Sequence, residues 1–145
     1  MIRPALLGLI SALLLTACSQ QPDEAQIRSR LDDMVTALEK RNARAFMAPL
    51  AEDFAADTWQ LDQRGVRLLL TREMRAHDRI RARLFDIDIR IDDPDRGMAS
   101  FHAILTGGSG LLPEQGSWYR VTTGWRREEG DWQLISAQWE RVAGR

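Results

Sequence analysis

The spacing of apolar side chains divides the chain into a helical half followed by a half made of strands. A first helix is predicted from apolar residues that recur at steps of 4, 3, 1 and 3: Ile27, Leu31, Met34, Val35 and Leu38. Pro22-Asp23-Glu24 suits its first turn, because proline needs no N–H partner there and acids favour the positive end of the helix dipole. Asn42 is expected to cap a short second helix that continues through Leu50 and is closed by Asp53-Phe54.

A third helix is predicted from Val66 to about Arg83. It follows an irregular stretch, Thr58–Gly65, in which Trp59 and Leu61 are the expected core anchors. At 100° per residue, one side of this helix is mainly apolar and the other is basic. The apolar side carries Val66, Leu69, Leu70, His77 and Ile80, and the basic side carries Arg72, Arg75, Arg79 and Arg83.

Beyond the third helix the apolar period changes to 2, which is typical of half-buried strands. In the first strand apolar residues alternate with charged ones, and its apolar positions are Phe85, Ile87, Ile89 and Ile91. A turn at 93–97 leads to a strand at Met98–Thr106, and Gly107-Gly108-Ser109-Gly110 opens a loop that runs past Pro113. Two further strands, 117–127 and 131–142, flank a turn at 128–130. Three helices followed by four antiparallel strands predict an α+β domain.

The N-terminal segment has the features of an export signal. Ala5–Leu15 is an apolar run that follows a single positive charge, and as a helix it spans only about half of a ~30 Å hydrocarbon core. Leu15-Thr16-Ala17-Cys18 follows directly and resembles the lipobox of bacterial lipoproteins. A plain secretory signal with a coincidental cysteine is the alternative interpretation.

The lipobox resemblance implies that residues 1–17 are removed as a signal peptide and that Cys18 carries acyl chains such as palmitate. Residues 18–23 would then form the lipidated cysteine and its tether. Several acyl chains hold a protein at a membrane far more firmly than one chain does. Ser19 is not the aspartate that usually retains such proteins in the inner membrane, so the expected place is the outer membrane, with the domain facing the periplasm.

Composition excludes several classes of protein and site. The chain has 145 residues, 28% of them charged, and a formal net charge of −1, which fits one soluble globular domain and gives no field suited to nucleic acid. Its single cysteine excludes an intramolecular disulfide and a cysteine-cluster zinc site. The only two histidines, His77 and His102, lack the spacing of a metal site, so we expect no metal and no cofactor.

The order of elements resembles the nuclear transport factor 2-like superfamily, which includes the SnoaL-like polyketide cyclases and the ketosteroid isomerases. The resemblance rests on Ala37–Asn42, Asp53-Phe54 and Gly130–Leu134, and it covers about residues 24–142. It implies a cone-shaped α+β barrel with a pocket at its open end and a sheet whose outer face often forms a homodimer. The superfamily contains isomerases, dehydratases and cyclases as well as binding domains, so the resemblance does not decide the chemistry.

Glu73 and His77 are the candidate catalytic residues, because a carboxylate and an imidazole four positions apart on a helix can act as a general acid/base pair. A shifted register or a solvated helix edge would remove that role. His102, Tyr119 and Trp125 are candidate pocket residues, although core packing is the simpler explanation of each.

Two further patterns each allow two interpretations. Arg72, Arg75 and Arg79 could bind phosphates or an acidic partner through their guanidinium groups, unless they form an ordinary solvated face. Four tryptophans are spaced by seven, and a hairpin turned between 128 and 129 would place Trp118 opposite Trp139 and Trp125 opposite Trp132 as core pairs or as a stacking platform.

The sequence therefore predicts a membrane-anchored periplasmic lipoprotein without catalytic activity. Its domain would bind a small apolar ligand or an envelope protein partner. The alternative is an isomerase, dehydratase or cyclase that uses Glu73 or His77 as the base and Tyr119 or His102 as the hydrogen-bond donor. A structural accessory that works through the sheet face or the arginines is a third hypothesis.

Overall fold

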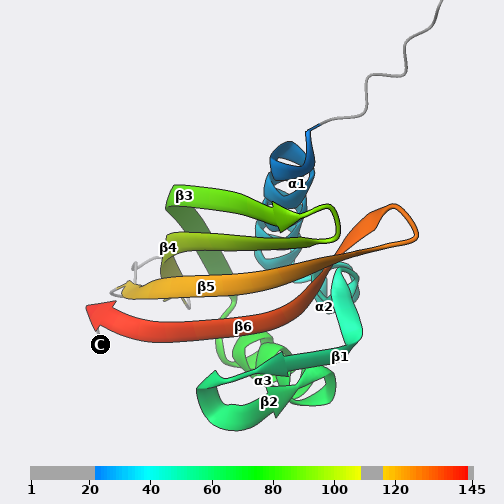
Figure 1. Cartoon of the computed structure of the whole chain (residues 1–145). Coiled ribbons are helices and arrows are strands. Elements are labelled where there is room, and N and C mark those ends of the chain that lie inside the picture. The colour runs from blue at the N-terminus through cyan, green and yellow to red at the C-terminus, as the bar shows by residue number, and fades with distance from the viewer. Residues whose placement is uncertain (1–21, 109–115, 144–145) are drawn as a thin grey trace, which may run out of the picture.

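A computed structural model describes residues 22–108 and 116–143 of the chain. The predicted signal peptide, Cys18 and the loop residues 109–113 lie outside the described residues. The helices are α1 (Asp23–Glu39), α2 (Ala43–Met47) and α3 (Gln63–Ala76), with a short 3-10 helix, η1 (Thr58–Gln60). The strands are β1 (Leu50–Ala56), β2 (Leu61–Asp62), β3 (Arg79–Asp93), β4 (Arg96–Gly108), β5 (Ser117–Glu128) and β6 (Asp131–Ala143). Figure 1 shows their arrangement.

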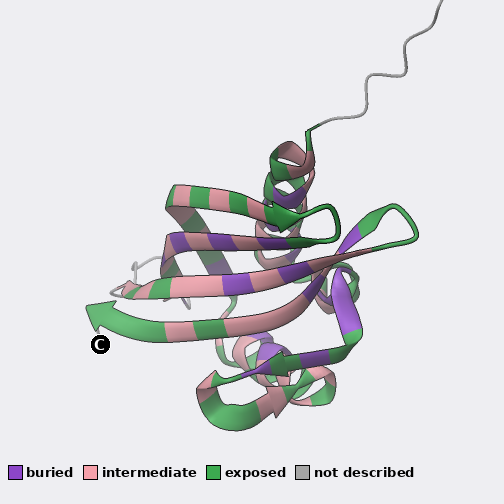
Figure 2. Cartoon of the chain, in the orientation of Figure 1, coloured by how far each residue is buried: buried purple, intermediate pink, exposed green. Residues whose placement is uncertain are grey.

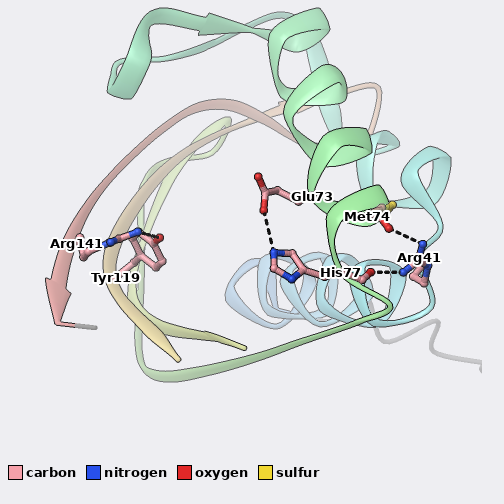
Figure 3. A network of polar contacts seen from close by, with 6 residues as sticks. All are labelled: Arg41, Glu73, Met74, His77, Tyr119 and Arg141. Carbon is pink, nitrogen blue, oxygen red and sulfur yellow. Dashed lines mark hydrogen bonds and ion pairs between the residues drawn. The ribbon is translucent and has the colours of Figure 1, made fainter. Parts of the chain in front are cut away.

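The described strands form one sheet in the order β2-β1-β6-β5-β4-β3. Strands β3 to β6 are joined as successive antiparallel hairpins, as predicted, whereas β1 pairs with β6 in parallel. The sheet is strongly curved and has the helices on its inner side (Figures 1 and 3). The α+β class and the hairpin order are therefore confirmed, but the sheet has six strands and not four.

The core lies between the inner face of the sheet and the helices. On β4 the buried residues Ala99, Phe101 and Ala103 alternate with more exposed ones, as the banding in Figure 2 shows. Trp125 and Trp132 are almost completely buried, at 0% and 1% exposure, and each contributes about 4–6 kcal/mol to folding as an upper estimate from its buried area. These two side chains fill the interior of the domain.

The second helix is shorter than predicted, and a strand follows it. Asn42 caps α2 as expected, since its side chain accepts a hydrogen bond from the Ala45 N–H at 3.0 Å. The helix ends at Met47, and Ala48 is its C-cap with backbone that is still helical, at φ −55° and ψ −41°. Pro49 follows and cannot continue the helix, because it has no N–H to donate. Leu50–Ala56 is therefore strand β1, with Phe54 buried in the core, and not the end of a helix.

The third helix ends at Ala76 and not near Arg83. His77 already has extended backbone, with φ −128° and ψ 126°, and β3 begins at Arg79. Residues 79–84 alternate arginine with apolar side chains, which is the period of a strand and not of a helix. The predicted arginine stripe is therefore divided, because Arg72 and Arg75 belong to α3 whereas Arg79 and Arg83 belong to β3.

A β-bulge in β3 divides the predicted apolar row between the two faces of the sheet. Phe85 pairs with His102 and Asp88 pairs with Ser100, so an extra residue lies between them, and Asp86 has a φ of 52°. Phe85 consequently lies on the outer face of the sheet, whereas Ile89 lies on the inner face opposite buried Ala99. The expectation that Phe85 shares a face with Ile89 is wrong.

The predicted tryptophan pairs do not form. Trp118 lies opposite Ala143 and Trp139 opposite Val121, while Trp125 lies opposite Leu134 and Trp132 opposite Arg127. The hairpin turns at Glu129-Gly130, and two register shifts along β5 and β6 move the partners further apart. Trp59, expected in the core, is 65% exposed, although Leu61 packs against the core as expected.

On the outer face an ion pair joins β1 to β5 across β6. Both terminal nitrogens of Arg126 donate to the Asp53 carboxylate, each at 2.9 Å, and the Arg126 Nε atom lies 2.6 Å from Glu128. The hydrogen bonds from Arg126 hold the pKa of Asp53 below its ordinary value of 3.8. This ion pair ties the irregular edge of the sheet to its hairpins.

We expect Asp53→Asn to destabilise the domain at neutral pH, and the difference from the wild-type chain to shrink in acid. Because the pKa of Asp53 is lower in the folded state, ionised Asp53 stabilises folding at pH values above 3.8, and this contribution is lost as the pH falls through the folded-state value. Urea unfolding at neutral pH and at about pH 3 measures it. Asp88→Asn, at an exposed position on β3, is the matched control, and a pH-independent difference would contradict the prediction.

Candidate functional site

The inner side of α3 carries the polar pair that the sequence singles out. Asp62 begins this helix by accepting a hydrogen bond from the Gly65 N–H at 2.7 Å, and buried Leu70 and Met74 fix which side faces the core. Glu73 lies beside Met74 and reaches the imidazole of His77, with 3.6 Å between Glu73 Oε2 and His77 Nε2 (Figure 3). The two side chains meet although His77 lies just outside the helix.

The imidazole of His77 packs against β4 at Gly107, where the lack of a side chain leaves room for the ring. A Cβ atom at Gly107 would lie 2.9 Å from both Cγ and Nδ1 of the imidazole, which is closer than real Cβ contacts. The His77 side chain is 28% exposed, whereas that of Glu73 is 43% exposed. The ring is therefore packed on the strand and still reaches the surface.

Arg41 fixes the end of α3, and sequence reasoning missed it. Its guanidinium donates hydrogen bonds to the carbonyl oxygens of Met74 and His77 (Figure 3). Carbonyls at a helix C-terminus have no partner within the helix, so a cation that binds them stabilises both the helix end and its dipole. Arg41 lies in the connection between α1 and α2, 33 residues before Met74, and no local pattern in the sequence could have paired them.

Tyr119 and Arg141 form a second polar pair on the inner face of β5 and β6. They lie directly opposite each other in the sheet, in the row next to Val121 and Trp139. Arg141 Nη2 donates to the Tyr119 hydroxyl at 3.1 Å, and the guanidinium carbon lies 5.6 Å from the centre of the ring. The hydroxyl accepts this bond and so keeps its own proton to donate to another group.

Both pairs lie on the inner side of the sheet and come from different parts of the fold. Figure 3 shows Glu73 and His77 at the end of α3, and Tyr119 and Arg141 on the strands across from them. The site so formed offers a carboxylate, an imidazole, a phenol and a guanidinium next to an apolar core. Of the sequence-predicted residues, Glu73, His77 and Tyr119 are thus brought to one side of the sheet. Arg141 was not predicted, since only the register of β6 against β5 reveals it.

His102 does not line the inside of the cone. It alternates with buried Phe101 and Ala103 on β4 and therefore projects from the outer face. There its ring stacks on Phe85 with centroids 5.3 Å apart, contacts Trp118 at 5.9 Å, and lies 3.5 Å from the Asp86 carboxylate. This outer aromatic cluster is separate from the inner site.

Trp125 and the arginine row are also placed away from the inner site. Trp125 has no exposed surface, and its indole N–H donates to Thr123 Oγ1 at 2.9 Å, while that hydroxyl donates to the Ala99 carbonyl at 3.1 Å. This chain of hydrogen bonds gives Trp125 a core role in the described structure. Arg72 and Arg75 are exposed on α3, and Arg79 begins β3, so the three do not form one helical face.

Two shallow hollows mark the described surface outside the inner site. One, of about 470 Å³, lies at the β5–β6 hairpin and is lined by Glu128, Glu129, Asp131 and Gln133. The other, of about 270 Å³, lies between the end of α1 and the start of β3. Within residues 22–108 and 116–143 no three His, Cys, Asp or Glu side chains gather as a metal site. No helix in this described part has the length and apolar character needed to cross a bilayer.

Comparison with solved structures identifies the fold. A nuclear transport factor 2-like protein of unknown function from Pseudomonas putida is 24% identical, with a TM-score of 0.68 over 81% of this chain and 84% of that one. A protein of unknown function with a cystatin-like fold from Nostoc punctiforme is 18% identical, with a TM-score of 0.70 over 86% and 95%. A candidate scytalone dehydratase from Novosphingobium aromaticivorans is 10% identical, with a TM-score of 0.71 over 83% and 84%.

The chain therefore has the nuclear transport factor 2-like, or cystatin-like, α+β cone fold. No protein-family model matches the sequence, and no curated protein sequence matches it either. At these low identities the structural likeness establishes the fold alone, so the chemistry must be argued from the site itself.

We expect Gly107→Ala to destabilise the domain by about 1–3 kcal/mol, because the added methyl group overlaps the imidazole of His77. In a His77→Ala background the same change should leave the free energy of unfolding almost unaltered, because the imidazole ring that the methyl group would overlap is absent. Urea unfolding of the wild-type chain, the two single variants and the double variant measures this coupling. An equal cost in both backgrounds would show that His77 does not pack on Gly107.

Proposed function

We propose that this protein is a membrane-anchored lipoprotein of the bacterial envelope whose nuclear transport factor 2-like domain binds a small, largely apolar ligand without chemically changing it. The observation that carries the proposal is the pair of polar walls: Glu73 and His77 face Tyr119 and Arg141 across the inner side of the sheet. Ligand sites are mostly apolar surfaces with a few convergent polar groups, and this inner side has that composition.

Binding at this site requires donors and acceptors that a ligand can share. The Tyr119 hydroxyl has a proton to donate, and the imidazole and the carboxylate of the facing pair are both partly exposed. A ligand carbonyl or hydroxyl could therefore be oriented by Tyr119 while its apolar body lies on the sheet. An envelope protein partner is the other occupant that the inner side could accept.

The proposed anchor rests on the sequence Leu15-Thr16-Ala17-Cys18 and on the short spacer between Cys18 and Asp23, where α1 begins. We propose lipidation of Cys18, removal of residues 1–17, and attachment to the outer membrane with the domain in the periplasm. The outer aromatic cluster of Phe85, His102 and Trp118 is the surface through which a homodimer would form in this proposal, since Trp118 is 38% exposed there.

A second candidate function is acid/base catalysis of the isomerase, dehydratase or cyclase type. The specific observation in its favour is the contact between Glu73 and His77, which places a carboxylate beside an imidazole on the inner wall. Glu73 or His77 would act as the base and Tyr119 as the hydrogen-bond donor. His102 cannot be the hydrogen-bond donor in this hypothesis, because its side chain projects from the outer face of the sheet.

The anchor is tested by substituting its cysteine. We expect Cys18→Ala to abolish incorporation of labelled palmitate and to release the chain from the membrane fraction, because the thiol is the proposed acceptor of the lipid. The measurement is metabolic labelling in a bacterial host followed by fractionation. Persistent labelling or unchanged membrane association of Cys18→Ala would contradict the proposed anchor.

Ligand binding is tested by native mass spectrometry of residues 19–145 purified from the periplasm. We expect an added small mass that is released on denaturation. The fraction of the domain that carries this mass should be lower in Tyr119→Phe, because phenylalanine has no hydroxyl to donate a hydrogen bond. Arg120→Gln, which changes the outer-facing neighbour of Tyr119, is the matched control and should retain the mass. A bare wild-type domain would argue against the ligand.

The same ligand, once identified, separates binding from catalysis. Binding alone predicts that the released mass equals the mass supplied, for the wild-type chain and for His77→Gln. An enzyme would return a changed molecule, and His77→Gln would abolish that change while the ligand still bound.

A further inference from the structure

The segment before α3 holds two consecutive residues in a conformation that side chains rarely adopt. Trp59 has a φ of 61° and Gln60 a φ of 52°, and neither is glycine. Left-handed backbone is costly for residues that carry a Cβ atom, and such strain persists only where the surrounding structure enforces it. The position of Trp59 is therefore imposed by its neighbours.

Strand β6 supplies the enforcing contacts. The Thr58 hydroxyl accepts a hydrogen bond from the Trp139 N–H at 2.9 Å and donates to the Trp139 carbonyl at 3.0 Å. The Asp57 N–H donates to the carbonyl of Ala137 at 3.1 Å, which extends the attachment by one more bond. One side chain thus occupies both main-chain groups of Trp139, and η1 is fastened beside the strand.

This attachment leaves the indole ring of Trp59 exposed. Trp59 is 65% exposed, the highest value among the large apolar side chains of the described residues. Its ring meets the ring of Trp139 edge to face, with centroids 5.6 Å apart and an angle of 89° between the planes. An indole that is held outside the core at a cost in backbone strain is a strong candidate for contact with a ligand.

A cationic side chain, Arg141, lies two residues from Trp139 on the same face of β6. Arg141 is two residues beyond Trp139, so both side chains project from the inner face, and Arg141 is exposed. Its guanidinium lies against the ring of Tyr119, which faces Glu73 and His77. We call Trp59, Trp139, Tyr119 and Arg141 the tryptophan–arginine patch.

We propose that the tryptophan–arginine patch binds a planar ring that carries an anionic group, with the ring on the indole of Trp59 and the anion on Arg141. This inference rests on the proposed ligand-binding function and specifies the chemical class of the ligand. Aromatic side chains stack with flat rings, and a guanidinium matches the geometry of a carboxylate, sulfonate or phosphate. A neutral aliphatic ligand would use neither feature of the patch.

Naphthalene-2-sulfonate is a suitable probe, with 2-naphthol as the uncharged ring and octane-1-sulfonate as the anion without a ring. The full chain, extracted in a nonionic detergent, has five tryptophans and so gives indole N–H signals that can be followed by NMR. We expect naphthalene-2-sulfonate to move the signals of Trp59 and Trp139 but not those of buried Trp125 and Trp132. Each control compound should bind at least about tenfold more weakly, because it lacks one of the two interactions.

Matched variants assign the binding to the patch. We expect Trp59→Ala to weaken naphthalene-2-sulfonate binding about tenfold, and Leu68→Ala, at a similarly exposed position on α3, to leave it unchanged. Arg141→Gln should remove the preference for naphthalene-2-sulfonate over 2-naphthol, whereas Arg120→Gln on the outer face should retain it. Trp59→Gly should melt at a higher temperature than Trp59→Ala, because glycine relieves the left-handed backbone.

Three results would overturn the inference. Unchanged affinity in Trp59→Ala, or signal changes confined to Trp118 on the outer face, would remove the patch from binding. Changes in the imidazole signals of His77 that are the same in Trp59→Ala would overturn the patch while supporting a ligand elsewhere on the inner side of the sheet. Absence of any change at Trp59, Trp139, Tyr119 and His77 would overturn the patch, and an empty domain in native mass spectrometry would then overturn the proposed function separately.

Discussion

The end of α3 at Ala76 is the constraint on which the rest of the site depends. Because Arg41 binds the carbonyls of Met74 and His77, the chain leaves the helix at His77 and can begin β3 two residues later. That early start places Ile80 opposite Gly107, and the imidazole of His77 packs on the same glycine. A helix continued to Arg83 would have removed the pairing of Ile80 with Gly107 and would have left that glycine without the ring that it accommodates.

Local patterns in the sequence were sufficient for most of the fold. The stripe from Ile27 to Leu38, the Asn42 cap and the hairpin turns are decided by neighbours a few residues apart, and these predictions are confirmed. Two errors went against local signals, namely the alternation of residues 79–84 and the proline that follows the second helix. The other errors arose where distant contacts decide the structure. The parallel pairing of β1 with β6, the bulge at Asp86 and the capping by Arg41 each join segments that no short window of sequence contains.

The candidate site was predictable to a similar extent. The four-residue spacing indicated Glu73 and His77, and the alternation along β5 placed Tyr119 on the same face as buried Trp125. Arg141 and Trp59 gave no comparable signal. The position of Arg141 depends on the register of β6 against β5, and the exposure of Trp59 depends on a left-handed backbone that no sequence pattern predicts. His102 was assigned to the wrong face. Alternation along β4 shows which residues share a face, but only the burial of the folded chain shows which face is inside.

Each polar side chain of the proposed site lies beside another polar side chain. Glu73 has His77 as its partner and Tyr119 accepts a hydrogen bond from Arg141, while the Tyr119 hydroxyl keeps its proton to donate. Because Glu73 and His77 are partly exposed, a ligand would replace hydrogen bonds that such groups make with water, and the net gain from polar groups is small. The affinity of such a site comes chiefly from apolar and stacking surface, while the polar pairs decide which ligand is accepted. In the binding mode that we propose, Trp59 and Trp139 supply that surface, and their edge-to-face contact is kept at the cost of backbone strain.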